Sequence, residues 1–228
     1  MNIKIANLND CAVVHADMVV VVDVFRAFST ACYIFGGDAE DLIPINSIES
    51  AYKFKRCSDD VVLIGESAGS KPPGFDYNNS PSEIKTVSFK NKTVVLSTSC
   101  GTKGLLKYSD AETVITGSFV NFSAVLHYIM QKNPRRLCII CTNCSFKENE
   151  DLFFANYLAE SLEDHDSDFS EIKAKLRTHA CSRYFFVNDT NFVSEEDFDL
   201  CLDKDRFNFV LKLEKNEKGI FHLKKLQF

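Results

Sequence analysis

The sequence has no tryptophan, only five prolines and nine glycines in 228 residues, and no apolar run long enough to cross a membrane. The scarcity of proline and glycine excludes a collagen-like or low-complexity chain. Apolar stretches such as Met18–Val22 have only the length of a strand. The first residues, Met1–Asp10, lack the apolar core of a signal peptide. We therefore expect a cytoplasmic protein that makes no membrane contact.

The sequence also lacks an excess of positive charge. Its net charge is −6, and residues of opposite sign are mixed along the chain rather than gathered in tails. A broad nucleic-acid interface is therefore not expected. Hydrophobic residues make up 45% of the chain and charged residues 25%, as in ordinary globular proteins. This length predicts a single domain over residues 1–228, with two similar lobes left open.

The nine cysteines are odd in number and scattered, so reduced thiols are expected rather than disulfides. The spacing Cys138-x-x-Cys141-x-x-Cys144 suggests a metal site, but Cys138 and Cys141 lie three residues apart in a predicted strand. Successive strand residues alternate between faces, so these two thiols point in opposite directions. A cysteine metal site is therefore not predicted.

Strand-length apolar runs alternate with helix-period segments, which predicts an α/β fold. A mostly parallel sheet with helices on both faces, in three α/β/α layers, follows from this order. The last part of the chain adds helices over Ser170–Phe186 and Ser194–Leu202 and a terminal strand pair. The main predicted strands are Met18–Val22, Leu42–Ile45, Val61–Ile64, Thr93–Ser97, Thr113–Thr116 and Leu137–Cys141, and the helices between them are Phe25–Phe35, Ser47–Cys57, Thr102–Tyr108, Val120–Gln131 and Asp151–Leu162.

Ligands of such folds bind beyond the carboxyl ends of the strands. Asp23 directly follows the apolar run Met18–Val22, and a carboxylate at the end of a buried strand needs a metal or an arginine as partner. Arg26 lies three residues on. The alternative is that Asp23 caps the following helix and pairs with Arg26 internally.

The segment Ser97–Gly104 is rich in hydroxyls and glycine and opens a helix. Free backbone N–H groups at such a turn favour an anion, although a plain turn is an equal alternative. Glu66, Asp76 and the pair Glu150-Asp151 supply further carboxylates. Magnesium takes one or two protein carboxylates and keeps water or phosphate as other ligands, whereas each acid alone could simply be solvated.

Taken together and in order, these segments resemble the 2-phosphosulfolactate phosphatase family. The resemblance covers nearly the whole chain and implies an α/β, magnesium-dependent phosphatase. The family's substrate, 2-phospho-3-sulfolactate, is hydrolysed to 3-sulfolactate and phosphate in coenzyme M biosynthesis. The sequence departs from the family pattern at Ser67, where Arg is usual, and at Cys100, where Asn is usual. The matching segments are Val22–Thr30, Gly65-Glu66, Gly74–Pro81, Ser99–Lys103, Gly117–Asn121, and Glu150-Asp151 with Ala155.

The resemblance and the strand-end residues together predict hydrolysis of a phosphomonoester of a small acid. We expect Asp23, Glu66 and Asp76 to bind Mg²⁺, and Asp23 and Arg26 to be catalytic. The predicted substrate- and phosphate-binding residues are Ser99, Cys100, Gly101, Thr102, Ser118, Asn121, Asn79 and Ser80. The partner is then a small phosphorylated acid, and homo-oligomer formation is left open. A non-catalytic anion-binding module, suggested by Ser67 and Cys100, and a nucleotide-binding enzyme are the alternatives.

Overall fold

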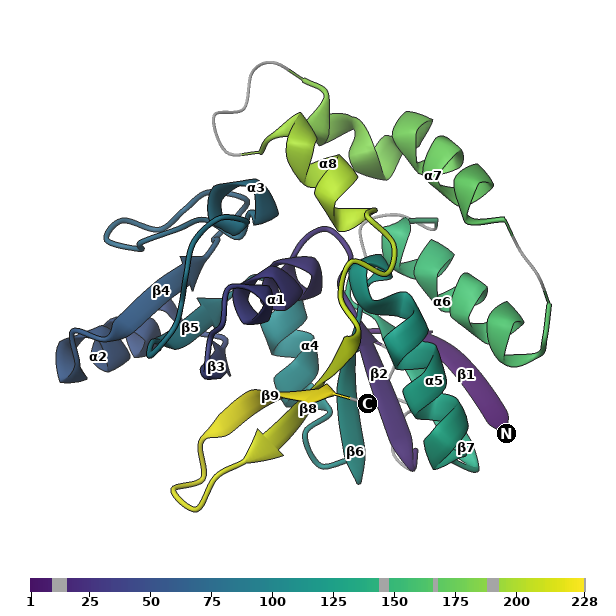
Figure 1. Ribbon diagram of the computed structural model, residues 1–228, viewed down its shortest axis with the longest axis horizontal. Coiled ribbons are helices and arrows are strands. Elements are labelled where there is room, and N and C mark those ends of the chain that lie inside the picture. The colour runs from purple at the N-terminus through teal and green to yellow at the C-terminus, as the bar shows by residue number, and fades with distance from the viewer. Residues whose placement is uncertain (10–15, 144–147, 166–167, 188–192, 228) are drawn as a thin grey trace.

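The computed structural model describes residues 1–9, 16–143, 148–165, 168–187 and 193–227 (Figure 1). Within these ranges the strands form one nine-stranded sheet in the order β1-β7-β2-β6-β8-β9-β3-β5-β4. Their bounds are Asn2–Asn7 (β1), Met18–Val22 (β2), Asp41–Ile45 (β3), Val61–Gly65 (β4), Thr93–Ser97 (β5), Thr113–Gly117 (β6), Arg136–Cys141 (β7), Phe209–Lys215 (β8) and Phe221–Gln227 (β9).

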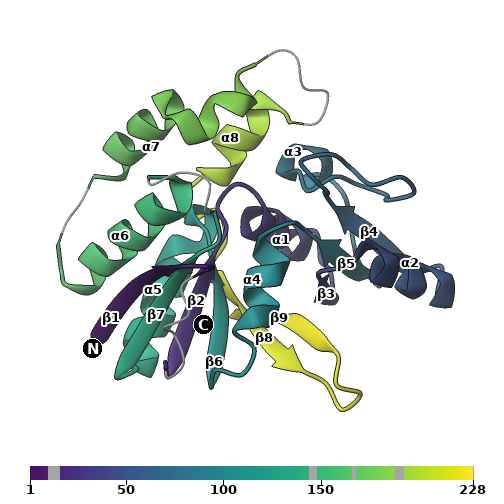
Figure 2. The same ribbon diagram turned by 180° about the vertical axis from the view of Figure 1, so that it is seen from behind.

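The sheet consists of two parallel groups joined by an antiparallel hairpin. Strands β1, β7, β2 and β6 form one group, and β3, β5 and β4 form the other. The hairpin β8–β9 lies between them and pairs with each group through one described residue pair, Ile115 with Lys212 and Leu42 with Leu223. Figure 2 shows the two groups from behind, on either side of this hairpin. The predicted α/β class is therefore confirmed, and the two groups share a single sheet.

Helices cover both faces of the sheet, as the sequence predicts. Along β2, Val19 and Val21 pack in the core that contains Phe28 of α1 and Leu105 of α4, whereas Val20 packs in the core on the opposite face with α5 and α6. The helices are Ala27–Gly36 (α1), Ile48–Cys57 (α2), Pro81–Ile84 (α3), Gly101–Lys107 (α4), Phe122–Lys132 (α5), Glu150–Leu162 (α6), Phe169–Thr178 (α7) and Glu195–Cys201 (α8), with 3₁₀ turns Phe119–Asn121 (η1) and Ala180–Phe185 (η2).

The second strand group is built in the same way but is smaller. Leu63 and Val95 pack against the α2 side, around Ala51. Their neighbours Leu96 and Val94 point to the other face and join the core that contains α1. Helix α1 therefore lies in a core shared by both groups, which brings their carboxyl ends to a common region.

Strand β1 is not among the predicted strands, although it pairs in parallel with β7 over six residues. Ile3 and Ile5 are partly buried and pack against the core, Ala6 is buried, and the polar residues of the strand are exposed, so its apolar run is broken. The prediction for the cysteines is confirmed: Cys138 packs in one core and Cys141 in the core of the opposite face. The cysteines in the described ranges form no disulfide with one another.

Helices α7 and α8 and the turn η2 lie beyond the carboxyl ends of the first strand group (Figure 1). Helix α8 also contacts α3, which belongs to the second strand group. No helix in the described part of the chain is both long and apolar enough to span a bilayer.

Candidate active site

A pocket of about 480 Å³ opens where the carboxyl ends of β2, β4, β5 and β7 meet. Two segments from beyond the sheet, η2 and the residues before α8, complete its wall. This is the position predicted from the strand-end rule. The residues that line the pocket are Asp23, Phe25, Arg26, Glu66, Ala68, Gly69, Ser70, Asn79, Thr98, Ser99, Cys100, Thr142, Asn143, Glu150, Cys181, Tyr184 and Val193.

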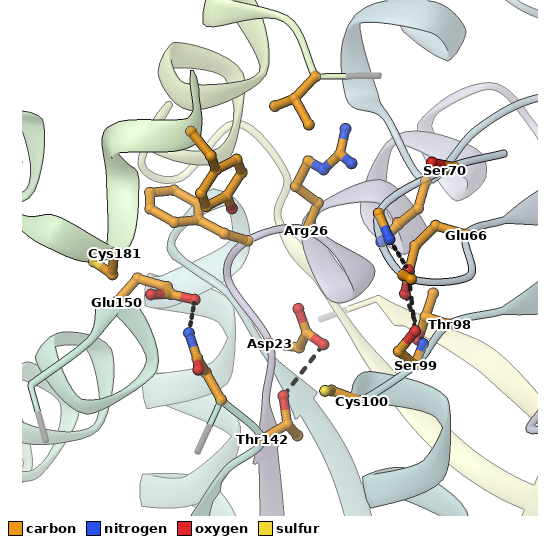
Figure 3. A pocket seen from close by; sticks show the side chains of 17 residues that line it. Asp23, Arg26, Glu66, Ser70, Thr98, Ser99, Cys100, Thr142, Glu150 and Cys181 are labelled. Atoms are coloured by element: carbon orange, nitrogen blue, oxygen red, sulfur yellow. Dashed lines mark hydrogen bonds between the residues drawn. The ribbon is translucent and has the colours of Figure 1, made fainter. Parts of the chain in front are cut away.

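Asp23 lies at the centre of the pocket, between Glu150 on one side and Glu66 on the other (Figure 3). Its Oδ1 accepts a hydrogen bond from the backbone N–H of Ala27, the first residue of α1, at 3.0 Å. Its Oδ2 accepts one from the hydroxyl of Thr142 at 3.2 Å. One oxygen therefore accepts from the first N–H of α1, although the N-cap residue of this helix is Arg26 and not Asp23, and the second oxygen faces another strand end. Burial, and next the charge of Asp151, raise the pKa of Asp23 to about 8.

Asp151 is a structural carboxylate directly behind the pocket. Its Oδ1 accepts from the backbone N–H of Val24 at 2.9 Å. Its Oδ2 accepts from the backbone N–H groups of Thr142 and Asn143 at 3.0 and 2.9 Å. Asp151 therefore ties the segment after β2 to the segment after β7, and so fixes the relative positions of Asp23 and Thr142.

Glu150 is the first residue of α6 and is 3% exposed. Its Oε1 accepts a hydrogen bond from the side-chain amide of Asn143 at 3.0 Å. Its Oε2 is buried without a hydrogen-bond partner among the described residues. Burial raises the pKa of Glu150 to about 7, and the charge of Asp23 contributes in the same direction. An unpartnered buried carboxylate oxygen is costly, so this atom is suited to a bound cation or a proton.

Arg26 is the one cationic side chain among the described residues that line the pocket. Its Nη1 donates to Oδ2 of Asp197 at 2.7 Å, and both side chains are almost fully buried. The alternative in which Arg26 pairs with Asp23 is therefore wrong. Asp197 lies in α8, 171 residues away in the sequence, so no local pattern indicates this partner.

The turn at Ser99–Thr102 is largely occupied by hydrogen bonds within the protein. Glu66 accepts from the backbone N–H of Ser99 at 2.6 Å and from its hydroxyl at 3.1 Å. The backbone N–H of Thr102 donates to the hydroxyl of Thr98 at 3.1 Å. Ser99 and Cys100 line the pocket, whereas Thr102 is buried behind it. This turn therefore presents fewer free N–H groups than the sequence predicts for a phosphate cradle.

Gly101 also lies outside the lining, but its position explains why glycine stands there. A Cβ atom on Gly101 would lie 2.6 Å from Oδ2 of Asp23 and 2.6 Å from Cβ of Ala27. Real carbon atoms do not approach so closely, so only glycine allows α4 to pack against the segment that carries Asp23.

Four further residues predicted for the site do not line the pocket. Asp76 accepts from the backbone N–H of Leu63 at 2.7 Å and pairs with Lys55 at 3.3 Å, which makes it a loop anchor. Ser80 donates to Asp197, and its neighbour Asn79 does line the pocket.

Ser118 and Asn121 are fully buried. The hydroxyl of Ser118 lies 2.6 Å from that of Ser29, and the side-chain amide of Asn121 donates to the carbonyl of Phe209 at 3.1 Å. Both side chains therefore connect α1 or β8 to the segment after β6 rather than facing a ligand.

The pocket also contains residues beyond the predicted ligands. Thr142 and Asn143 follow the end of β7, so the strand-end rule points to their segment, and Glu150 is one of the further carboxylates that the sequence offers for magnesium. Cys181 and Tyr184 come from η2 and carry no strand-end signal. Together with Phe25 and Val193, Tyr184 adds an apolar part to the lining of the pocket.

The carboxylates of the pocket are chemically suited to magnesium. Within the described ranges, no three or more His, Cys, Asp or Glu side chains form a ready-made metal cluster. Magnesium, however, needs only one or two protein carboxylates beside water and phosphate. Asp23 and Glu150 meet this demand, because both are buried, both line the pocket and Glu150 Oε2 has no described partner. Glu66 is the third carboxylate of the lining, and both of its oxygens accept hydrogen bonds, as those of Asp23 do.

The fold and the pocket define an α/β protein with an acidic small-molecule site at the ends of two parallel strand groups. A model of the 2-phosphosulpholactate phosphatase family matches residues 6–216. A probable 2-phosphosulfolactate phosphatase from Thermoplasma acidophilum is 35% identical over 196 residues, which cover 86% of this chain and 85% of that protein. One of the same description from Thermotoga maritima is 32% identical over 230 residues, or 94% and 95% of the two chains.

The chain therefore belongs to the 2-phosphosulpholactate phosphatase family. This confirms the resemblance described from its motifs. The family is one of phosphoric monoester hydrolases, so the predicted enzyme class is confirmed at that level.

Proposed function

We propose that this protein hydrolyses a phosphomonoester of a small acid in the pocket around Asp23, with magnesium as its cofactor. The observation that carries the proposal is that buried carboxylates and one cationic side chain, Arg26, line the same described pocket at the carboxyl edge of the sheet. The volume of about 480 Å³ suits a small molecule rather than a polymer.

The relatives named as probable 2-phosphosulfolactate phosphatases support 2-phospho-3-sulfolactate as the first substrate to test. The coenzyme M pathway and a cytoplasmic location stay predictions. The apolar part of the lining, formed by Phe25, Tyr184 and Val193, would contact the part of the substrate that carries no charge.

Asp23 and Glu150 are the residues that would hold the magnesium ion. When bound, the ion supplies positive charge that polarises the phosphate group. Arg26 would bind phosphate oxygens through the guanidinium donors that Asp197 does not use, because planar guanidinium groups match the geometry of phosphate. Thr142 would keep Asp23 oriented through its hydroxyl. Phe25 and Tyr184 would limit the access of bulk water to the reacting group.

The test is phosphate release from a panel of phosphorylated small acids, 2-phospho-3-sulfolactate included, with magnesium and again with a chelator. Turnover that the chelator abolishes is the expected result, and the panel then ranks the substrates. A folded protein that releases no phosphate from any of them would contradict the proposal. That result would favour the alternative of a non-catalytic anion-binding module, which Ser67 and Cys100 suggested.

A further inference from the structure

Asp197 is a fully buried carboxylate that does not line the pocket and yet contacts Arg26, one of the pocket's principal residues. Its Oδ2 accepts from Nη1 of Arg26 at 2.7 Å. Its Oδ1 accepts from the backbone N–H of Ser82 at 2.8 Å, and the hydroxyl of Ser80 donates to the same carboxylate at 2.8 to 2.9 Å. The side chain of Asp197 therefore forms its hydrogen bonds with two other segments, the start of α1 and the start of α3.

We propose that Asp197 is a positioning residue of the active site, which holds the guanidinium of Arg26 in place for the phosphate group. The inference rests on the proposed phosphatase function for the identity of the anion. Its structural part, a pre-positioned arginine in the pocket, can be tested with inorganic phosphate alone.

The geometry of arginine supports this role. A guanidinium has five N–H donors in one plane, and Asp197 uses Nη1. The Nε and Nη2 groups have no acceptor among the residues that the structure describes. A charge-assisted bond to Asp197 therefore fixes the plane of the guanidinium and leaves one of its edges for a ligand. An arginine that is already fixed loses less side-chain entropy when the anion binds.

The second set of contacts gives Asp197 a wider effect on the pocket. The start of α3 directly follows Asn79, which lines the pocket on the side of the second strand group. Arg26 belongs to the segment after β2, in the first strand group. One carboxylate on α8 therefore connects side chains from both walls, and sets Arg26 relative to Asn79.

A plain structural role for Asp197 is the competing interpretation. Removing either partner of a buried ion pair destabilises a protein, because the other charge is left uncompensated. Loss of stability or of activity alone cannot separate the two interpretations. The separating observation is whether the effect of Asp197 on anion binding depends on the presence of Arg26.

The experiment is a double-mutant cycle with Asp197→Asn, Arg26→Met and the double variant. Asparagine keeps the size and an acceptor oxygen but lacks the charge. The affinity for inorganic phosphate is measured by calorimetry with the metal present, and kcat and KM for the panel substrate are measured in parallel. Glu196→Gln is the matched control, because Glu196 is the neighbouring residue of α8 and pairs with Lys85 of the α3 segment rather than with Arg26.

The expected result is that Asp197→Asn weakens phosphate binding and kcat/KM on the order of 10- to 100-fold. In the Arg26→Met background the same change should have less than about a threefold effect, and Glu196→Gln should behave as the wild type. Equal losses with and without Arg26 would overturn the proposal, as would an Asp197→Asn variant with unchanged phosphate affinity.

Two further outcomes keep the two proposals apart. If the wild type binds phosphate but hydrolyses no substrate, the phosphatase function fails while the cycle on phosphate affinity still decides the role of Asp197. If Asp197→Asn does not fold, Asp197→Glu replaces it: the charge is kept but displaced by one methylene. Weakened phosphate binding by that variant supports positioning if the effect disappears in the Arg26→Met background, and an equal loss in that background or wild-type binding contradicts it.

Discussion

Gly101 packs so closely against Asp23 that an added Cβ would lie 2.6 Å from its carboxylate oxygen. The N-terminus of α4 can therefore pack this closely against the segment after β2 only because Gly101 has no side chain. The sequence predicts that Gly101 binds phosphate and that Asp23 is catalytic, but the structure indicates a different role for Gly101. Gly101 supports the position of Asp23 rather than contacting a ligand.

Gly101→Ala should consequently reduce turnover by displacing Asp23, and should cost about 1 to 3 kcal/mol of stability through overpacking. Phosphate release and the midpoint of urea denaturation measure the two effects. A variant with wild-type turnover and stability would show that the segment after β2 moves freely, contrary to the fixed arrangement around Asp151.

Asp23→Asn should abolish turnover while leaving the fold intact. The carboxylate at the strand end is lost, but asparagine keeps an oxygen for the backbone N–H of Ala27. Because burial disfavours the charged form of Asp23, its removal should maintain or raise the melting temperature at pH 8. Phosphate release and a thermal melt of the same sample give both readouts. Normal turnover in this variant would refute the role of Asp23.

The metal-free protein should lose stability as the pH rises from about 5 to about 8. Burial raises the pKa of Asp23 and of Asp151 to about 8 and that of Glu150 to about 7, against about 4 in the unfolded chain. Between these values the folded state binds more protons than the unfolded state, so the free energy of unfolding decreases as the pH rises. Their contribution is fully present below the unfolded pKa and is lost as the pH passes through the folded pKa.

Thermal melts at several pH values, with a chelator present, measure this slope. Asp23→Asn should flatten it, and saturating magnesium should raise the melting temperature more at pH 8 than at pH 5. A melting temperature that rises with pH over this window in the metal-free wild type would contradict the assignment.

Much of the fold follows from local pattern, because continuous β-branched runs between helix-period segments determine a parallel sheet. Strand β1 shows the limit of this approach. Its apolar side chains Ile3 and Ile5 are only partly buried and are separated by polar residues, and Ala6 alone is buried, so the apolar pattern of this strand is weak. The strand-end rule similarly locates Asp23, Glu66 and the segment around Thr142.

The rest of the site depends on long-range contacts that no local pattern contains. Asp76 resembles a ligand in sequence, but its carboxylate is used by the backbone of β4. Tyr184 lines the pocket, and Asp197 contacts Arg26, because the last helices fold back over the first strand group. Their positions depend on tertiary packing, so only the structure reveals them.

Glu150→Gln should weaken magnesium binding about tenfold or more and reduce the number of protons released on binding. A carboxyl with a raised pKa is partly protonated near neutral pH, and the ion must displace that proton. Calorimetry in two buffers of different ionisation enthalpy measures the affinity and the proton release together. Glu148→Gln is the control, since Glu148 is exposed and lies outside the pocket. Equal magnesium affinity in both variants would exclude Glu150 as a ligand.

Cys100→Asn should preserve or raise activity and stabilise the protein by about 1 kcal/mol. Cys100 occupies the N-cap position of α4 and makes no side-chain capping hydrogen bond there, whereas asparagine is among the best N-cap residues. Asparagine is also the residue that the resemblance to the family leads us to expect at this position. The thiol is exposed and lines the pocket, so the change alters a surface that the substrate would meet. Phosphate release and the midpoint of denaturation are the measurements. A large loss of turnover with unchanged stability would show that the thiol itself has a specific role at this site, and that this chain differs from the family pattern in its chemistry as well as in its sequence.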